Sequence, residues 1–162
     1  MPLLLLLALT QSTVFTRLHV GGAVPNLVLC AVVVWNLLRG TREGLVWAFV
    51  GGLALDLLSA GPLGLSSIAL LAVCALAGLA EGRVQPQSLV LSLVAVTLGT
   101  MVFDAIVLLG LVLSGHALGQ LDVVAGLVLA SVLLNVLGML PLHWLLRRLY
   151  LAAERSEVRL SA

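Results

Sequence analysis

The sequence predicts an all-α fold: a polytopic membrane bundle of six transmembrane helices with both termini in the cytoplasm. Of its 162 residues, 62% are hydrophobic and 9% are charged, and the mean hydropathy is +1.24. A soluble domain of this size cannot keep that much apolar surface out of water. Six apolar runs and a one-sided distribution of arginines complete the prediction. With a formal net charge of +1, the chain offers no clustered basic face, so we expect no nucleic-acid partner.

Each expected helix is an apolar run bounded by turn residues. A spanning helix needs about 20 apolar residues, so the first three runs are short for a full span. The runs are continuous and rich in leucine rather than alternating, which excludes transmembrane strands. The expected helices are Leu3–Phe15, Pro25–Leu38, Gly44–Leu58, Leu63–Ala80, Leu89–Leu113 and Leu121–Leu146.

Glycine and proline mark the connections between these runs. Gly40 breaks the chain before the third helix, and we expect the adjacent Thr41 to cap that helix. The first run lacks the positively charged start of a signal peptide, so we expect it to be retained as a helix. We expect one domain, residues 1–150, followed by a short cytoplasmic tail, residues 151–162.

The arginines set the orientation. With the N-terminus inside and six spans, seven of the eight Lys and Arg residues fall on the cytoplasmic side, and only Arg17 lies outside. Asn36 and His143 then lie near cytoplasmic helix ends, where we expect them to reach headgroups or water. The three tryptophans lie in the same layer, as an interfacial aromatic belt requires: Trp35, Trp47 and Trp144.

Asp56 is the most unusual residue, because a carboxylate within an apolar helix is costly and needs a partner. Gly52 lies on the same helical face, so we expect this face to pack against another helix rather than lipid. Three roles are open. The carboxylate accepts hydrogen bonds from backbone N–H groups of the next turn (Gly61, Leu63, Gly64), binds a partner helix or ligand, or relays a proton or ion.

Two further polar stripes lie on later helices. Asp104 shares a face with Thr100, and Asn135 shares one with Ser131. Such faces join helices, typically for about 1 kcal/mol or less per contact. The spacing leaves open whether these stripes meet Asp56 in one polar core.

We expect no enzyme, no cofactor and no metal site. The Gly-x-Gly-Asp element of intramembrane aspartyl proteases and the Asn-Leu-x-Asp-Arg element of lipoprotein signal peptidase are both absent around Asp56. No Cys/His set has metal-ligand spacing. Cys30 and Cys74 lie inside apolar runs, as small core residues do.

The central stretch resembles the MreD family of the bacterial rod-shape (elongation) machinery. The resemblance implies a non-enzymatic subunit of the inner (cytoplasmic) membrane that helps regulate cell shape and peptidoglycan synthesis. Its implied partner is MreC, a bitopic protein with a periplasmic domain, in an assembly with MreB filaments, the glycosyltransferase RodA and its transpeptidase. The residues that carry the resemblance are Pro25, Arg39-Gly40, Gly44, Gly51-Gly52-Leu53, Asp56-Leu57-Leu58, Gly61-Pro62-Leu63-Gly64 and Gly78.

By this resemblance, the family's aspartate corresponds to Asp56, and its Gly-x-Leu-Gly turn corresponds to the four residues from Gly61 to Gly64. We expect these residues to shape the bundle or to face a partner's transmembrane helix. Together with the polar stripes, they give the following partner-binding or structural residues: Gly51, Gly52, Asp56, Gly61, Pro62, Leu63, Gly64, Asp104 and Asn135.

An alternative function follows from the six-helix fold. The family resembles the substrate-binding subunits of energy-coupling-factor vitamin transporters. In that case the polar stripes enclose a pocket that is open to the outside and lined by aromatic residues. The chain has seven aromatic residues, and three of them are the tryptophans assigned to the inner interface, which counts against this alternative.

Overall fold

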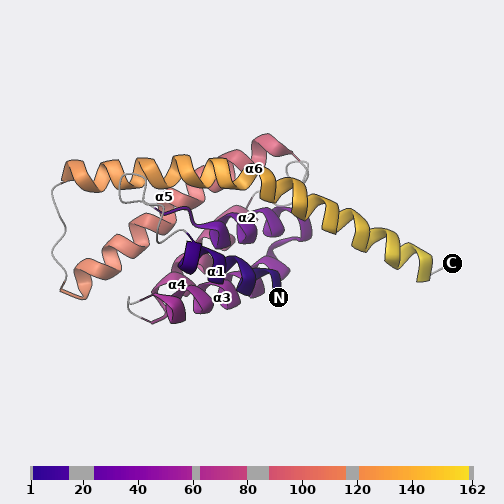
Figure 1. Cartoon of the computed structure of the whole chain (residues 1–162), viewed down its shortest axis with the longest axis horizontal. Coiled ribbons are helices and arrows are strands. Elements are labelled where there is room, and N and C mark those ends of the chain that lie inside the picture. The colour runs from indigo at the N-terminus through magenta and orange to yellow at the C-terminus, as the bar shows by residue number, and fades with distance from the viewer. Residues whose placement is uncertain (1, 15–23, 60–62, 80–87, 116–120, 161–162) are drawn as a thin grey trace.

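The computed structural model describes residues 2–14, 24–59, 63–79, 88–115 and 121–160. These residues form helices and short turns and contain no strand, so the predicted all-α fold is confirmed (Figure 1). The helices are α1 (Pro2–Val14), α2 (Leu27–Arg39), α3 (Thr41–Leu58), α4 (Leu65–Gly78), α5 (Leu89–Leu113) and α6 (Leu121–Leu160).

Two helix ends differ most from the prediction. The predicted Thr41 cap is wrong: Gly40, at φ 92°, precedes the helix, and Thr41 is its first residue. The Thr41 side chain instead packs against Gly78 of α4, which leaves room for it. At the other end of the chain, α6 continues past Leu146 to Leu160. No Gly or Pro follows Leu146 in this helix, and Leu, Ala, Glu and Arg are strong helix formers.

α6 also contains a proline that the prediction did not use. Pro141 lies inside the helix, where it removes one backbone hydrogen bond and favours a kink. Figure 1 shows α6 bending part-way along its length and then projecting beyond the other helices. The helix therefore continues through the proline but changes direction.

α2 is the centre of the bundle. All seven residues from Val28 to Val34 are fully buried, and α2 contacts each of α1, α3, α4, α5 and α6. A helix that is apolar on all sides is stable only when it is covered on all sides. Its 13 residues span about 20 Å, so it is shorter than the hydrocarbon core of a bilayer.

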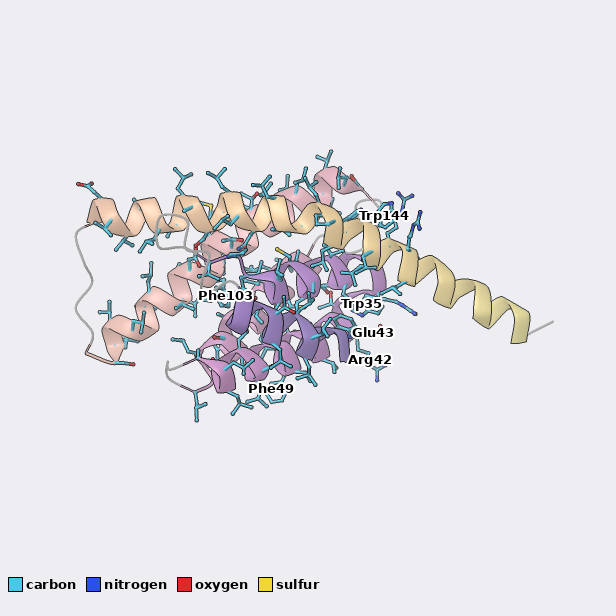
Figure 2. All side chains as sticks on the ribbon, viewed as in Figure 1. Trp35, Arg42, Glu43, Phe49, Phe103 and Trp144 are labelled. Atoms are coloured by element: carbon cyan, nitrogen blue, oxygen red, sulfur yellow. The ribbon has the colours of Figure 1, made fainter. Side chains whose placement is uncertain are left out.

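Apolar side chains cover the outer faces of the bundle, and several polar side chains lie inside it. Large apolar side chains are exposed along the outer faces of α3, α4, α5 and α6 (Figure 2). In water such a surface aggregates, whereas in a bilayer it faces lipid. The buried polar residues are Asn36, Asp56, Ser67, Ser92, Thr100, Asn135 and His143.

Two helices of the described chain are long and apolar enough to cross a membrane, Leu89–Leu113 and the part of α6 from Asp122 to Tyr150. Leu27–Arg39 and Leu65–Gly78 are apolar but shorter. The predicted count of six spans is therefore not confirmed by helix length and hydropathy.

Aromatic and cationic side chains gather at one end of the bundle. The Trp35 and Trp47 rings stack with their centroids 4.3 Å apart. The Arg39 guanidinium lies 5.6 Å from the centroid of the Trp35 ring and 5.5 Å from that of Tyr150, which joins α2 to α6. Figure 2 shows Trp35 and Trp144 toward this same end. The end therefore has the composition of a membrane interface.

Asn36 and His143 do not reach headgroups or water, and that prediction is wrong. Asn36 is 3% exposed, and its Nδ2 donates a hydrogen bond to the Cys74 carbonyl at 2.9 Å. The missing side chain at Gly44 lets α3 cover it, because a Cβ there would lie 2.5 Å from Asn36 Oδ1. His143 of α6 is 5% exposed, and its side chain contacts Ser92 of α5.

Candidate functional site

The Asp56 carboxylate lies at the N-terminus of α4 and is 1% exposed. Oδ2 accepts hydrogen bonds from the Gly64 N–H at 3.0 Å, the Ser67 N–H at 3.3 Å and the Ser67 hydroxyl at 3.0 Å. Oδ1 accepts one from the Ser66 N–H at 2.9 Å. The first N–H groups of a helix lack intrahelical partners and carry the positive end of its dipole. Asp56 of α3 therefore caps α4, a helix other than its own.

The sequence named three N–H donors for Asp56, and the structure places them differently. The Gly64 N–H is a donor, as expected. Leu63 is instead 74% exposed, and the first turn of α4 supplies the other donors. Gly61 and Pro62 lie outside the described residues.

The glycine pair before Asp56 allows two close approaches. A Cβ on Gly52 would collide with the backbone of Ser67, so α3 and α4 touch there at backbone distance. A Cβ on Gly51 would lie 2.7 Å from Val28 Cγ1, so the neighbouring face of α3 packs on a side chain of α2. The face that carries Gly52 and Asp56 is thus filled by α4 of the same chain.

A second set of polar contacts joins α5 to α6, and we call it the polar ladder. Each step of four or eight residues forward on α5 is matched by an equal step backward on α6, so the two helices are antiparallel in one constant register. Its hydrogen-bonded pairs are Ser92 Oγ with His143 Nδ1 at 3.1 Å and Thr100 Oγ1 with Asn135 Nδ2 at 3.0 Å. Asp104 and Ser131 occupy the next position in the same register and line one cavity.

Asn135 also joins the ladder to the central helix. Its Oδ1 accepts a hydrogen bond from the Asn26 N–H at 2.6 Å, and the Asn26 side chain caps α2 by accepting from the Leu29 N–H at 3.0 Å. The Cys30 thiol donates to the Asn135 carbonyl at 3.3 Å. The stripes of Asn135 and Asp104 therefore meet on one interface, while the described partners of Asp56 belong to the start of α4.

The family model of the rod shape-determining protein MreD matches residues 1–152. The chain belongs to the MreD family. The resemblance first seen around Asp56 is therefore confirmed, and it extends through α5 and most of α6. No curated protein and no solved structure matches the chain.

MreD-family proteins are structural, shape-determining membrane proteins, and the arrangement of this MreD-family chain agrees with that role. Among the described residues, no group of three or more His, Cys, Asp or Glu side chains could hold a metal ion. The site residues are paired with backbone groups and with each other rather than aimed at a shared reaction centre. Their chemistry is that of helix-to-helix attachment.

Sequence reasoning missed the Ser92–His143 pair of this MreD-family chain. The signal was present as an i, i+4 series on α5, in which Ser92, Thr100 and Asp104 share one face. The pairing itself joins residues 51 apart in the sequence. It requires the register of α6, which local spacing does not provide.

Proposed function

We propose that this chain is a non-enzymatic scaffold subunit of the bacterial rod-shape (elongation) complex, located in the inner membrane. In this proposal it binds MreC and thereby helps regulate cell shape and peptidoglycan synthesis, in an assembly with RodA, its transpeptidase and MreB. The observation that carries the proposal is the MreD family match over residues 1–152.

The interior polar residues support a scaffold role. Asp56 and Asn135 direct their hydrogen bonds to other helices of the same chain. We assign Gly51, Gly52, Asp56 and Gly64 to the internal packing of α3, which keeps the bundle in one shape. Partner binding then falls to the outer, apolar surface, where helix association in lipid depends on shape and a few hydrogen bonds.

We also propose six spans with both termini in the cytoplasm, one domain over residues 1–150 and a cytoplasmic tail over 151–162. Three contacts at one end of the bundle support this topology, because they join helix ends that six spans place on the same side. Thr41 meets Gly78, Ser92 meets His143, and Arg39 meets Tyr150 of α6. The short helices require a locally thinned bilayer or cover by longer neighbours.

The transporter alternative is not supported. It requires Asp56, Asp104 and Asn135 around one pocket with an aromatic lining. Asp56 and Asn135 are instead engaged on different interfaces. A cavity of about 160 Å³ between α4 and α5 is lined by aliphatic residues and Gly99. An apolar groove of this kind suits lipid better than a polar vitamin.

Co-purification from membranes tests the proposal. A tagged copy of the full chain, solubilised from membranes with MreC present, is expected to retain MreC, and an unrelated polytopic protein with the same tag is not. Absence of MreC from a folded, monodisperse sample would refute the scaffold assignment. Retention of a small ligand in place of MreC would favour the transporter class.

A further inference from the structure

Four arginines lie at the end of the bundle where α2, α3 and α6 meet. They are Arg39, Arg42, Arg147 and Arg148, and we call this part of the surface the cationic end. The one carboxylate among the described side chains there is Glu43, whose Oε2 lies 4.0 Å from Arg39 Nε (Figure 2). One carboxylate cannot neutralise four guanidinium groups, so the described side chains give this end a net positive charge.

Aromatic rings hold two of these arginines in place. The Arg148 guanidinium lies 3.7 Å from the centroid of the Trp144 ring, and the Arg39 guanidinium lies near both Trp35 and Tyr150. Stacking on a ring uses the flat face of a guanidinium group and leaves the N–H groups at its edge free to donate. Arg148 is exposed and has no carboxylate partner among the described side chains. It is therefore a positioned donor that can accept an anion.

The surface next to Arg148 is apolar, and this decides which kind of anion it meets. Trp144, Leu145 and Leu149 of the same helix are all exposed. Exposed apolar side chains of this size face lipid, so an arginine directly beside them lies at the level of the headgroups. A phospholipid headgroup at that depth reaches the guanidinium while its acyl chains cover the leucines. An acidic protein surface offers the charge but not the apolar cover.

We propose that the cationic end binds the phosphate of an anionic phospholipid in the cytoplasmic leaflet, with Arg148 on the Trp144 ring as its main ligand. The inference rests on the proposed six-span topology, which places this end in the cytoplasm. The edge of a guanidinium group donates two parallel hydrogen bonds to a phosphate. A zwitterionic headgroup carries its own ammonium group, which the arginines repel, so the cationic end favours lipids whose headgroup lacks one.

Native mass spectrometry of the purified full chain tests the preference. The chain is offered equal amounts of phosphatidylglycerol and phosphatidylethanolamine with the same acyl chains, and we expect it to retain mainly phosphatidylglycerol. Arg148→Gln is expected to lower this preference by about fivefold. Arg17→Gln loses the same charge on the side that the topology places outside, and it should keep the preference. Equal retention of the two lipids by the wild type, or the same preference in all three proteins, would overturn the proposal.

Two further arms separate the headgroup from simpler explanations. Arg148→Lys keeps the charge but loses the flat, ring-stacked donor edge, so we expect a preference below that of the wild type; a preference equal to the wild type would refute the role of the stacked guanidinium. Millimolar inorganic phosphate should not displace the bound lipid, and displacement would assign the site to a free anion instead. All variants must elute as the wild type does on size exclusion.

The lipid preference and the scaffold function can fail separately. The preference is measured on the purified chain alone, whereas the scaffold function is measured by MreC capture from membranes. Loss of the preference with MreC still captured would refute the lipid site and leave the scaffold. A clear preference for phosphatidylglycerol without MreC capture would support the lipid site and refute the scaffold.

Discussion

Asp56 is stable inside an apolar bundle because four donors surround it, and three of them belong to the backbone at the N-terminus of α4. Without the carboxylate, those N–H groups would have no hydrogen-bond acceptor in lipid. Each unpaired N–H group in hydrocarbon costs on the order of several kcal/mol of free energy. The carboxylate thus supplies the acceptors that the N-terminus of α4 needs, and the N-terminus supplies donors that the buried carboxylate needs. This mutual dependence predicts which substitutions the position tolerates.

Asp56→Asn is expected to lower the free energy of unfolding by about 1–3 kcal/mol, because an NH₂ group replaces one carboxylate oxygen and cannot accept a hydrogen bond from the donors that face it. Asp56→Leu removes every acceptor and is expected to cost more. Thermal unfolding in detergent measures both. Asp122→Asn, at an exposed carboxylate in the first turn of α6, is the matched control. Equal unfolding temperatures for the control and both Asp56 variants would contradict the capping role.

Two glycines in helix interiors are expected to respond oppositely to alanine. At Gly52 the added methyl group meets the backbone of Ser67, which cannot move aside as a side chain can, so Gly52→Ala destabilises the bundle. At Gly126 nothing lies within 4 Å of the new Cβ, so Gly126→Ala gains about 0.5–1 kcal/mol from helix propensity. Unfolding temperatures of the two variants check this pair. A neutral Gly52→Ala would contradict the backbone contact between α3 and α4 at this position.

The polar pairs between α5 and α6 fix how these two helices pack against each other. Contacts at every fourth residue on both helices place polar pairs in line, with Val96 and Met139 as an apolar layer between two of them. In lipid, where apolar packing has no hydrophobic drive, such pairs select one register over its neighbours. A shift by one residue would separate every pair at once.

A double-mutant cycle on Thr100 and Asn135 measures the contribution of one hydrogen-bonded pair of the polar ladder. We expect a coupling free energy of about 0.6 kcal/mol, and no more than about 2 kcal/mol, between Thr100→Val and Asn135→Ala. Ser114, which hydrogen-bonds within α5, serves as the control partner, and Ser114→Ala should be additive with Asn135→Ala. Additivity of both pairs in unfolding experiments would show that the Thr100–Asn135 bond does not contribute.

The helices themselves could largely be predicted, because their ends carry local signals. α5 has its predicted bounds, with Ser88 capping the first turn through the Leu91 N–H and Ser114 following the last. The extension of α6 was missed because charged residues were read as the end of a helix, although helices continue into water when propensity allows. The central place of α2 was not predicted, because hydropathy identifies an apolar helix but not the neighbours that cover it.

The candidate site could be predicted only where its contacts are local. Asp56 and its donors lie within 11 residues of each other, so a turn after a helix suffices to infer the cap. Asn135 bonds to Asn26, 109 residues away, and the choice of that partner depends on how α2 docks against α6. Periodicity identifies the polar face of each helix, but tertiary packing decides which faces meet.

At the scale of the whole molecule, helix length varies with position. The central helix α2 has 13 residues, whereas α5 has 25, so the outer pair extends beyond the inner helices by roughly 15 Å or more at 1.5 Å per residue. Figure 1 shows this pair projecting past α2 and α3. None of residues 101–115 of the α5 end and none of residues 122–134 of α6 is buried. The molecule thus has a closed half and a half in which the apolar faces of α5 and α6 are open.

The proposed topology makes a prediction about sidedness. Glu43 and Ser114 are both exposed, and three helices separate them, so they should lie on opposite sides of the membrane. In intact spheroplasts, an impermeant thiol reagent is expected to label Ser114→Cys and to label Glu43→Cys only after permeabilisation. The native Cys30 and Cys74 are buried and should remain unlabelled. Labelling of both positions from the same side would exclude six spans.

Capture of MreC by the folded chain tests the account most directly. The measurement is co-purification from membranes of the tagged chain with MreC, and an unrelated polytopic protein with the same tag is the control. We predict that the wild type retains MreC and that Asp56→Asn, when folded, retains it equally, because the contacts of Asp56 lie inside the bundle. No retention by a monodisperse wild type, or loss of MreC by a folded Asp56→Asn, would contradict the account.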